Sequence, residues 1–123
     1  MGFLSNLMQP KDFDGKVDKL FNYYKTNTRL VSPGFIRDKQ HLKRAISEIA
    51  AVLGNPVEQL SYDEIKEYGT VFGAVLARAA SASFFGGGSS LIQNTGEVLY
   101  NRFSFLRTKA NSEEVAKRLF NLI

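Results

Sequence analysis

His41 and Asp38 have the residue types and spacing of a histidine base with its carboxylate partner. His41 is the one histidine in the chain, and Asp38 precedes it by about one helical turn. A histidine base also needs a reacting group within reach, and no position in the sequence indicates one. Asp38 is equally suited to cap the start of a helix, with His41 as a solvated helix residue. We favour the capping interpretation and expect a non-enzymatic protein.

Asp12, Asp14 and Asp18 stand around Gly15 in a pattern that partly matches a calcium-binding loop. The full pattern has a third oxygen ligand directly before the glycine and a glutamate where this chain has Phe21. Here Gly15 directly follows the second aspartate. Acidic side chains are also favourable at the start of a helix, where they face the positive end of its dipole. We expect that structural role.

Asp63, Glu64 and Glu67 form a second group of carboxylates, and Asp63 and Glu67 would share one face of a helix. Ferritin-like metal sites combine such residues with Glu-x-x-His pairs from facing helices. The chain has no second histidine for such a site and no cysteine for a thiolate site. The sequence therefore predicts no metal and no cofactor. Ser61 followed by Glu64 instead indicates a capping box at the start of a helix.

Two basic groups support an alternative function, that of a nucleic-acid-associated factor. The candidate residues are Lys39, Lys43 and Arg44 in one group and Arg102, Arg107 and Lys109 in the other. Residues 49–60 also have the spacing of a helix-turn-helix around Gly54. Its recognition segment would carry the second group of carboxylates, which a phosphate backbone repels. Nucleic-acid binding through residues 37–44 and 102–118 is therefore the alternative and not the preferred function.

Small residues recur at every fourth position of an almost uncharged segment, in the order Gly69, Gly73, Ala77 and Ser81. On a helix this spacing makes a flat strip that allows another backbone to approach closely. We expect a central helix that its neighbours bury, and Gly69, Gly73 and Ala77 are candidates for self-association or partner binding. A membrane span is disfavoured, because Arg78 lies in the middle of a segment that is barely long enough.

Residues 1–10 are a candidate apolar arm. Phe3, Leu4, Leu7 and Met8 would lie on one side of a short helix and are candidate protein-binding residues. The alternative is that the arm folds back onto its own bundle. No lysine or arginine precedes Lys11, so the segment lacks the basic region of a secretory signal and the charges that favour a membrane surface. We expect a cytoplasmic protein.

Hydrophobic periodicity predicts helices throughout the chain, and no segment alternates in the manner of a strand. The triple glycine at 86–88 predicts a flexible elbow, because a phosphate-binding loop would follow a strand and contain a lysine. The sequence therefore predicts an all-α bundle of about five helices in one domain over residues 1–123. The expected helices lie near 15–27, with Asp14 as the cap, near 37–53 and 61–85, then near 90–106, with a last one that Asn111 or Ser112 caps.

The composition agrees with this interpretation. With 123 residues and 44% of them hydrophobic, the chain can form one core and is not disordered. The formal net charge of +4 divides into two basic ends around an acidic middle, residues 61–100. The sequence thus predicts an α-helical interaction module, such as an adaptor, inhibitor or assembly subunit, whose partner is another protein or a second copy.

Overall fold

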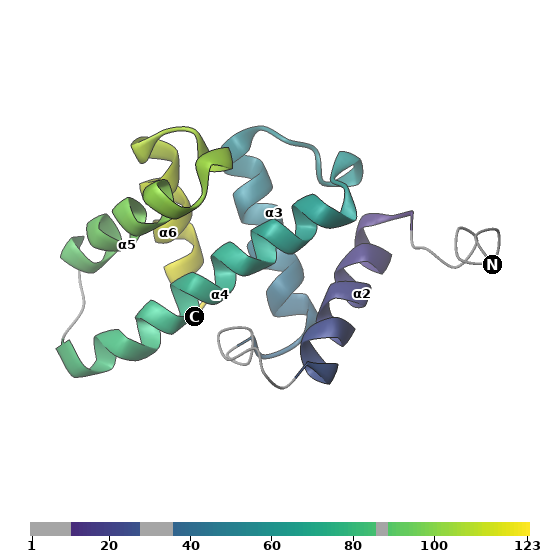
Figure 1. The fold of residues 1–123 in the computed structure, drawn as a ribbon, viewed down its shortest axis with the longest axis horizontal. Helices are drawn as coiled ribbons and strands as arrows, with labels where there is room; N and C mark the ends of the chain where they lie inside the picture. Colours follow the sequence, from purple (N-terminus) through teal and green to yellow (C-terminus); the bar gives the residue numbers. More distant parts are fainter. Residues whose placement is uncertain (1–10, 28–35, 86–88) are drawn as a thin grey trace.

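The computed structural model describes residues 11–27, 36–85 and 89–123, in which all regular structure is helical (Figure 1). The predicted all-α bundle of about five helices is confirmed, and no strand occurs in these ranges. The candidate arm with Phe3, Leu4, Leu7 and Met8 lies outside the described residues. The α-helices are α2 (Phe13–Thr26), α3 (Lys39–Leu53), α4 (Tyr62–Phe85), α5 (Ser89–Arg102) and α6 (Lys109–Phe120), with short 3-10 helices η2 (Val57–Gln59) and η3 (Ser104–Leu106) between them.

The long helix α4 is the central element of the bundle. In Figure 1 it crosses the view diagonally, with α2 near its N-terminal end and α5 near its other end. Phe72, close to its midpoint, is fully buried. Removal of aliphatic and aromatic side chains from water is the main favourable term in folding. The core takes side chains from all five helices, among them Val17, Leu20, Leu42, Ile46, Ile49, Ile65, Val75, Leu99, Val115 and Leu119.

Two helices begin earlier in the chain than predicted. Asp12 caps α2, where the sequence suggested a later start, and its carboxylate accepts a backbone N–H at 2.9 Å. Thr108 caps α6 in the same way, with a distance of 3.0 Å, so the prediction of Asn111 or Ser112 was wrong. In both cases an equally good capping residue precedes the predicted one, by two residues at α2 and by three or four at α6.

Three other predicted helix ends are confirmed. The Asp38 carboxylate accepts the N–H of His41 at 2.8 Å at the start of α3. The capping box is complete, because Ser61 N–H donates to Glu64 Oε1 at 2.9 Å and Glu64 N–H donates to Ser61 Oγ at 3.1 Å. Gly54 ends α3 in the left-handed conformation, with φ 72° and ψ 24°.

Changing Gly54 to alanine should lower the free energy of unfolding by about 1 kcal/mol. Apart from its chain neighbours, no heavy atom lies within 4 Å of the position that a Cβ atom would take. The cost therefore comes from the left-handed backbone alone and not from a clash. Urea denaturation measures it, and Gly54→Asn should lose less because asparagine tolerates this conformation better. Equal stability of the wild type and Gly54→Ala would contradict this account.

The connection between α3 and α4 differs from a helix-turn-helix. Residues 54–61 separate the two helices and include η2, whereas a helix-turn-helix has a turn of about three or four residues. The first turns of α4 direct Ile65 and Tyr68 into the core and leave Asp63, Glu64 and Glu67 exposed. The helix that would read DNA therefore presents carboxylates to solvent.

Candidate interaction surfaces

The small-residue strip begins inside the fold. Gly69 and Gly73 are both buried, and Gly69 faces α2. A Cβ atom at Gly69 would lie 2.5 Å from Tyr24 Oη and 2.9 Å from Leu20 Cδ2, closer than van der Waals contact permits. The missing side chain thus lets α2 pack tightly on α4. At these two positions the strip belongs to the interior of the chain and is not an open surface.

Further along α4 the strip becomes accessible. Ala77 is half-buried and Ser81 is exposed, whereas every residue from Val71 to Leu76 is buried. Figure 1 shows the second half of α4 extending away from α2. Arg78 Nε donates to Thr95 Oγ1 at 3.0 Å, which links this half of α4 to α5. We call residues 77–81 the projecting end of α4.

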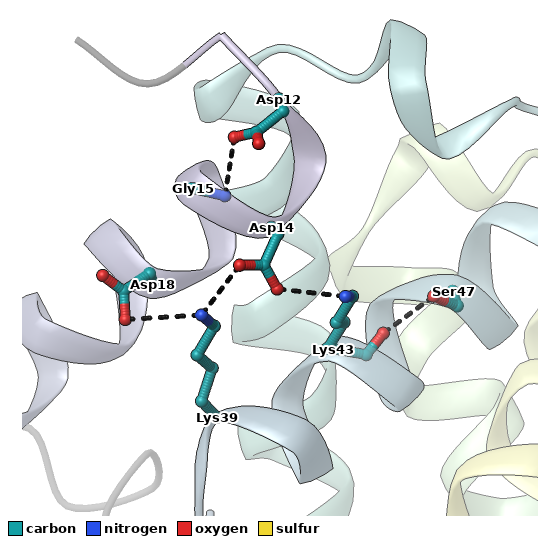
Figure 2. Close-up of polar contacts among 7 residues, drawn as sticks. All are labelled: Asp12, Asp14, Gly15, Asp18, Lys39, Lys43 and Ser47. Carbon is teal, nitrogen blue, oxygen red and sulfur yellow. Dashed lines mark hydrogen bonds and ion pairs between the residues drawn. The ribbon is translucent and has the colours of Figure 1, made fainter.

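Lys39 and Lys43, of the first basic group, are held by carboxylates of α2 (Figure 2). Lys39 Nζ lies 2.9 Å from Asp14 Oδ2, and Lys43 Nζ lies 3.0 Å from Asp14 Oδ1. Lys39 Nζ also lies 3.7 Å from Asp18 Oδ1. Hydrogen bonds from the two lysines hold the pKa of Asp14 below its ordinary value, and the bond to Asp14 raises the pKa of Lys39. These pairs join α2 to α3 and oppose phosphate binding by both lysines, while Arg44 remains exposed.

Arg102, Arg107 and Lys109, of the second basic group, are exposed near the connection between α5 and α6. Within the described ranges none of the three forms an ion pair with a carboxylate. Lys109 nevertheless shares a shallow cleft with Glu97 and Glu113, and Arg107 shares another with two glutamates of α4. These carboxylates would weaken the attraction of a phosphate backbone. Nucleic-acid binding by this group stays a prediction.

The cleft beside Arg107 has a volume of about 230 Å³ and was not expected from the sequence. Arg107 has φ 74° and ψ −50°, and Thr108 N–H donates to Leu106 O at 2.9 Å, so the chain reverses through a γ-turn. Tyr68 and Phe105 line the cleft and stack with their ring centroids 5.4 Å apart. No sequence pattern indicates a γ-turn at an arginine, because residues other than glycine rarely adopt a positive φ. With one guanidinium and two carboxylates in its lining, the cleft has a small net negative charge.

His41 lies in the core and is not the solvated residue that the sequence suggested. Its side chain is 4% exposed, and its ring meets the Phe72 ring edge-on with 4.8 Å between centroids. Nδ1 accepts the N–H of Arg37 at 3.2 Å, and Nε2 lies 3.0 Å from the carbonyl oxygen of Leu122. These contacts fit a neutral ring with its proton on Nε2. Burial lowers the pKa of His41, so the neutral form is favoured.

The Asp38 carboxylate caps α3 through the backbone of His41, as described above, and the ring hydrogen bonds are those to Arg37 and Leu122. The ring therefore connects the start of α3 to the last residues of the chain. Both groups have structural roles here, and neither arrangement resembles an activated base.

Comparisons with protein families, with curated proteins and with solved structures gave no match. In the ranges that the structure covers, none of the helices has the length and apolar character needed to cross a membrane. The same ranges contain no group of three or more His, Asp or Glu side chains placed to hold a metal ion. The surfaces of the helices are thus the basis for a functional proposal.

Proposed function

We propose that this chain is an α-helical protein-interaction module without enzymatic activity, which associates with a second copy of itself through the projecting end of α4. One observation carries the proposal: the burial of an almost uncharged helix declines after Leu76, and Ser81 is exposed. A cytoplasmic location is part of the proposal.

The physical argument rests on the difference between the two halves of α4. A helix that is apolar on all sides is normally buried on all sides by neighbouring elements. Residues 68–85 carry one charged side chain, Arg78, yet burial by the described residues declines after Leu76. Ala77 and Ser81 have short side chains, so a second helix could approach them more closely than it could approach long side chains. A second copy offers the same surface, which satisfies the symmetry of a twofold dimer.

Light scattering after size-exclusion chromatography tests this function. We expect the wild type to be a dimer, and we expect Ser81→Arg to shift it toward the monomer, because two copies would bring these positively charged side chains together. Ser81 is exposed, so the folded chain should tolerate the change. Ala77→Arg should act in the same direction.

Gln40→Arg is the matched control, because it adds the same charge at an exposed position on α3. It should leave the dimer unchanged, and melting temperatures of all variants show whether they fold. A wild type that remains monomeric at its highest soluble concentration would exclude self-association as the function of this surface.

Nucleic-acid association remains the second candidate. It is favoured by the exposure of Arg44, Arg102, Arg107 and Lys109 without carboxylate partners in the described ranges. It is disfavoured by the ion pairs of Lys39 and Lys43 and by the acidic start of α4. The balance of these charges places it behind the protein-interaction proposal.

A further inference from the structure

A group of tyrosines and lysines lies where α2 packs against the start of α4. We call Lys19 and Tyr23 of α2, together with Tyr62 and Lys66 of α4, the tyrosine–lysine face. Lys19 Nζ lies 4.3 Å from the centroid of the Tyr62 ring, and Lys66 Nζ lies 5.6 Å from the centroid of the Tyr23 ring. Each helix therefore places its lysine over the tyrosine of the other helix, which brings two cations and two rings together.

The two cations of this face have no carboxylate partner within the described ranges. Lys19 and Lys66 are both exposed, and Tyr23 is 41% exposed. Asp18, the neighbour of Lys19 in the chain, has its carboxylate beside Lys39. Contact of an ammonium group with a ring is weak at an exposed site, so each lysine can turn toward an incoming anion at little cost.

The tyrosines add hydrogen-bond donors to the face. Burial raises the pKa of Tyr62 and also that of Tyr24, which follows Tyr23 in the chain, so both phenols stay protonated at neutral pH. A protonated phenol donates a hydrogen bond to a carboxylate or a backbone carbonyl. Tyrosine is also enriched at the energetically important positions of protein interfaces, because it combines apolar area with a polar tip.

We propose that the tyrosine–lysine face binds an acidic peptide segment of a partner protein, whose carboxylates pair with Lys19 and Lys66 while its apolar groups contact Tyr23 and Tyr62. Charge complementarity favours an acidic partner, because Lys19 and Lys66 form no ion pair in the described ranges and lie next to aromatic surface. Asp18, Asp63 and Glu67 flank the lysines and tyrosines in the chain, and all three are exposed. These carboxylates would repel the closely spaced phosphates of a nucleic acid. A peptide can instead place single carboxylates next to the lysines and away from these acidic side chains. The face lies apart from the projecting end of α4, so this binding does not require the self-association proposed above.

Fluorescence anisotropy with two labelled peptides tests this partner chemistry. One peptide alternates glutamate with leucine, and the other replaces every glutamate with glutamine. The glutamate peptide should bind at low ionic strength and lose affinity as salt is added, because the pairs are exposed to solvent. The glutamine peptide should bind at least about tenfold more weakly. Equal binding of the two peptides would overturn the proposal.

Variants of the chain locate the binding site. The double variant Lys19→Gln/Lys66→Gln should weaken binding of the glutamate peptide by at least about tenfold. The control Lys11→Gln/Lys117→Gln removes the same charge from two other exposed lysines and should change the affinity by less than about threefold. Melting temperatures of both variants should match the wild type, because none of the four lysines is buried. If both double variants lose affinity equally, binding depends on net charge alone and the proposal is wrong.

A single-stranded oligonucleotide with as many phosphates as the peptide has glutamates serves as the competing probe. If it binds more tightly than the peptide and depends on Lys19 and Lys66, the face binds nucleic acid and not a protein segment. Light scattering of the Lys19→Gln/Lys66→Gln variant should show the same oligomeric state as the wild type. The two proposals can therefore fail independently.

Discussion

Replacing Gly96 with valine should lower the free energy of unfolding by about 2–3 kcal/mol and the melting temperature by roughly 10 °C. A Cβ atom at Gly96 would lie 2.8 Å from Glu113 Cα and 3.1 Å from Glu113 N, so α5 would collide with the backbone of α6. A backbone cannot rotate away as the end of a side chain can. The two helices would have to separate, which would disturb the packing of core side chains on both, such as Leu99 and Val115.

Gln93→Val is the matched control, because it introduces the same residue about one turn earlier on α5, at an exposed position. It should change the stability by less than about 0.5 kcal/mol. Thermal and urea denaturation of the three proteins measure the difference. A Gly96→Val variant as stable as Gln93→Val would mean that α5 and α6 are not held as close as the structure places them.

Acidification should destabilise the protein as His41 becomes protonated. The folded state holds the pKa of His41 below its ordinary value of 6.5, mainly because the ring is buried, while Arg37 and Arg44 add repulsion. The Leu122 carbonyl and Asp38 act in the opposite direction with smaller effect. The unfolded chain therefore binds more protons than the folded chain below about pH 6.5. The contribution of the neutral ring to stability is fully present above that pH. Below it the free energy of unfolding should fall, by at most about 1.4 kcal/mol per pH unit.

Because His41 is the one histidine in the sequence, its ring signals can be followed by NMR without ambiguity. The titration should show a pKa below 6.5. His41→Phe keeps a ring against Phe72 but removes both ring nitrogens, which leaves the Arg37 N–H and the Leu122 carbonyl without these partners. The substitution should lower the free energy of unfolding by about 2 kcal/mol at pH 7.5. It should also remove the pH dependence of stability between about pH 5 and pH 6.5. An ordinary or raised pKa, or an unchanged pH profile in His41→Phe, would show that the ring is not held neutral.

Local signals in the sequence were reliable where they depend on neighbouring residues. The capping box at Ser61 and Glu64, the left-handed end of α3 at Gly54 and the helix that ends at Phe85 could all be predicted. Each reflects interactions within about one or two turns of helix. The caps of α2 and α6 were misplaced because two suitable residues lie close together, and only backbone geometry distinguishes Asp12 from Asp14.

The surfaces were harder to predict, because their residues come from different helices. Nothing in the sequence indicates that Asp14 forms ion pairs with Lys39 and Lys43. Nor does it indicate that Lys19 and Lys66 each lie over a tyrosine of the opposite helix. The sequence of α3 therefore suggested phosphate binding, whereas in the structure Lys39 and Lys43 pair with Asp14. The small-residue strip can be read from the sequence, but its two halves have different environments in the structure.

The sequence by itself determined that this chain is helical, where most helices end, and that no thiol or multi-histidine chemistry is available to it. These properties follow from residue types and short-range spacing. The tertiary structure decided which charged side chains form ion pairs, that His41 is buried, and where along α4 the burial declines. Ion pairing and burial depend on the distance between residues far apart in the chain, and helical periodicity does not encode that distance.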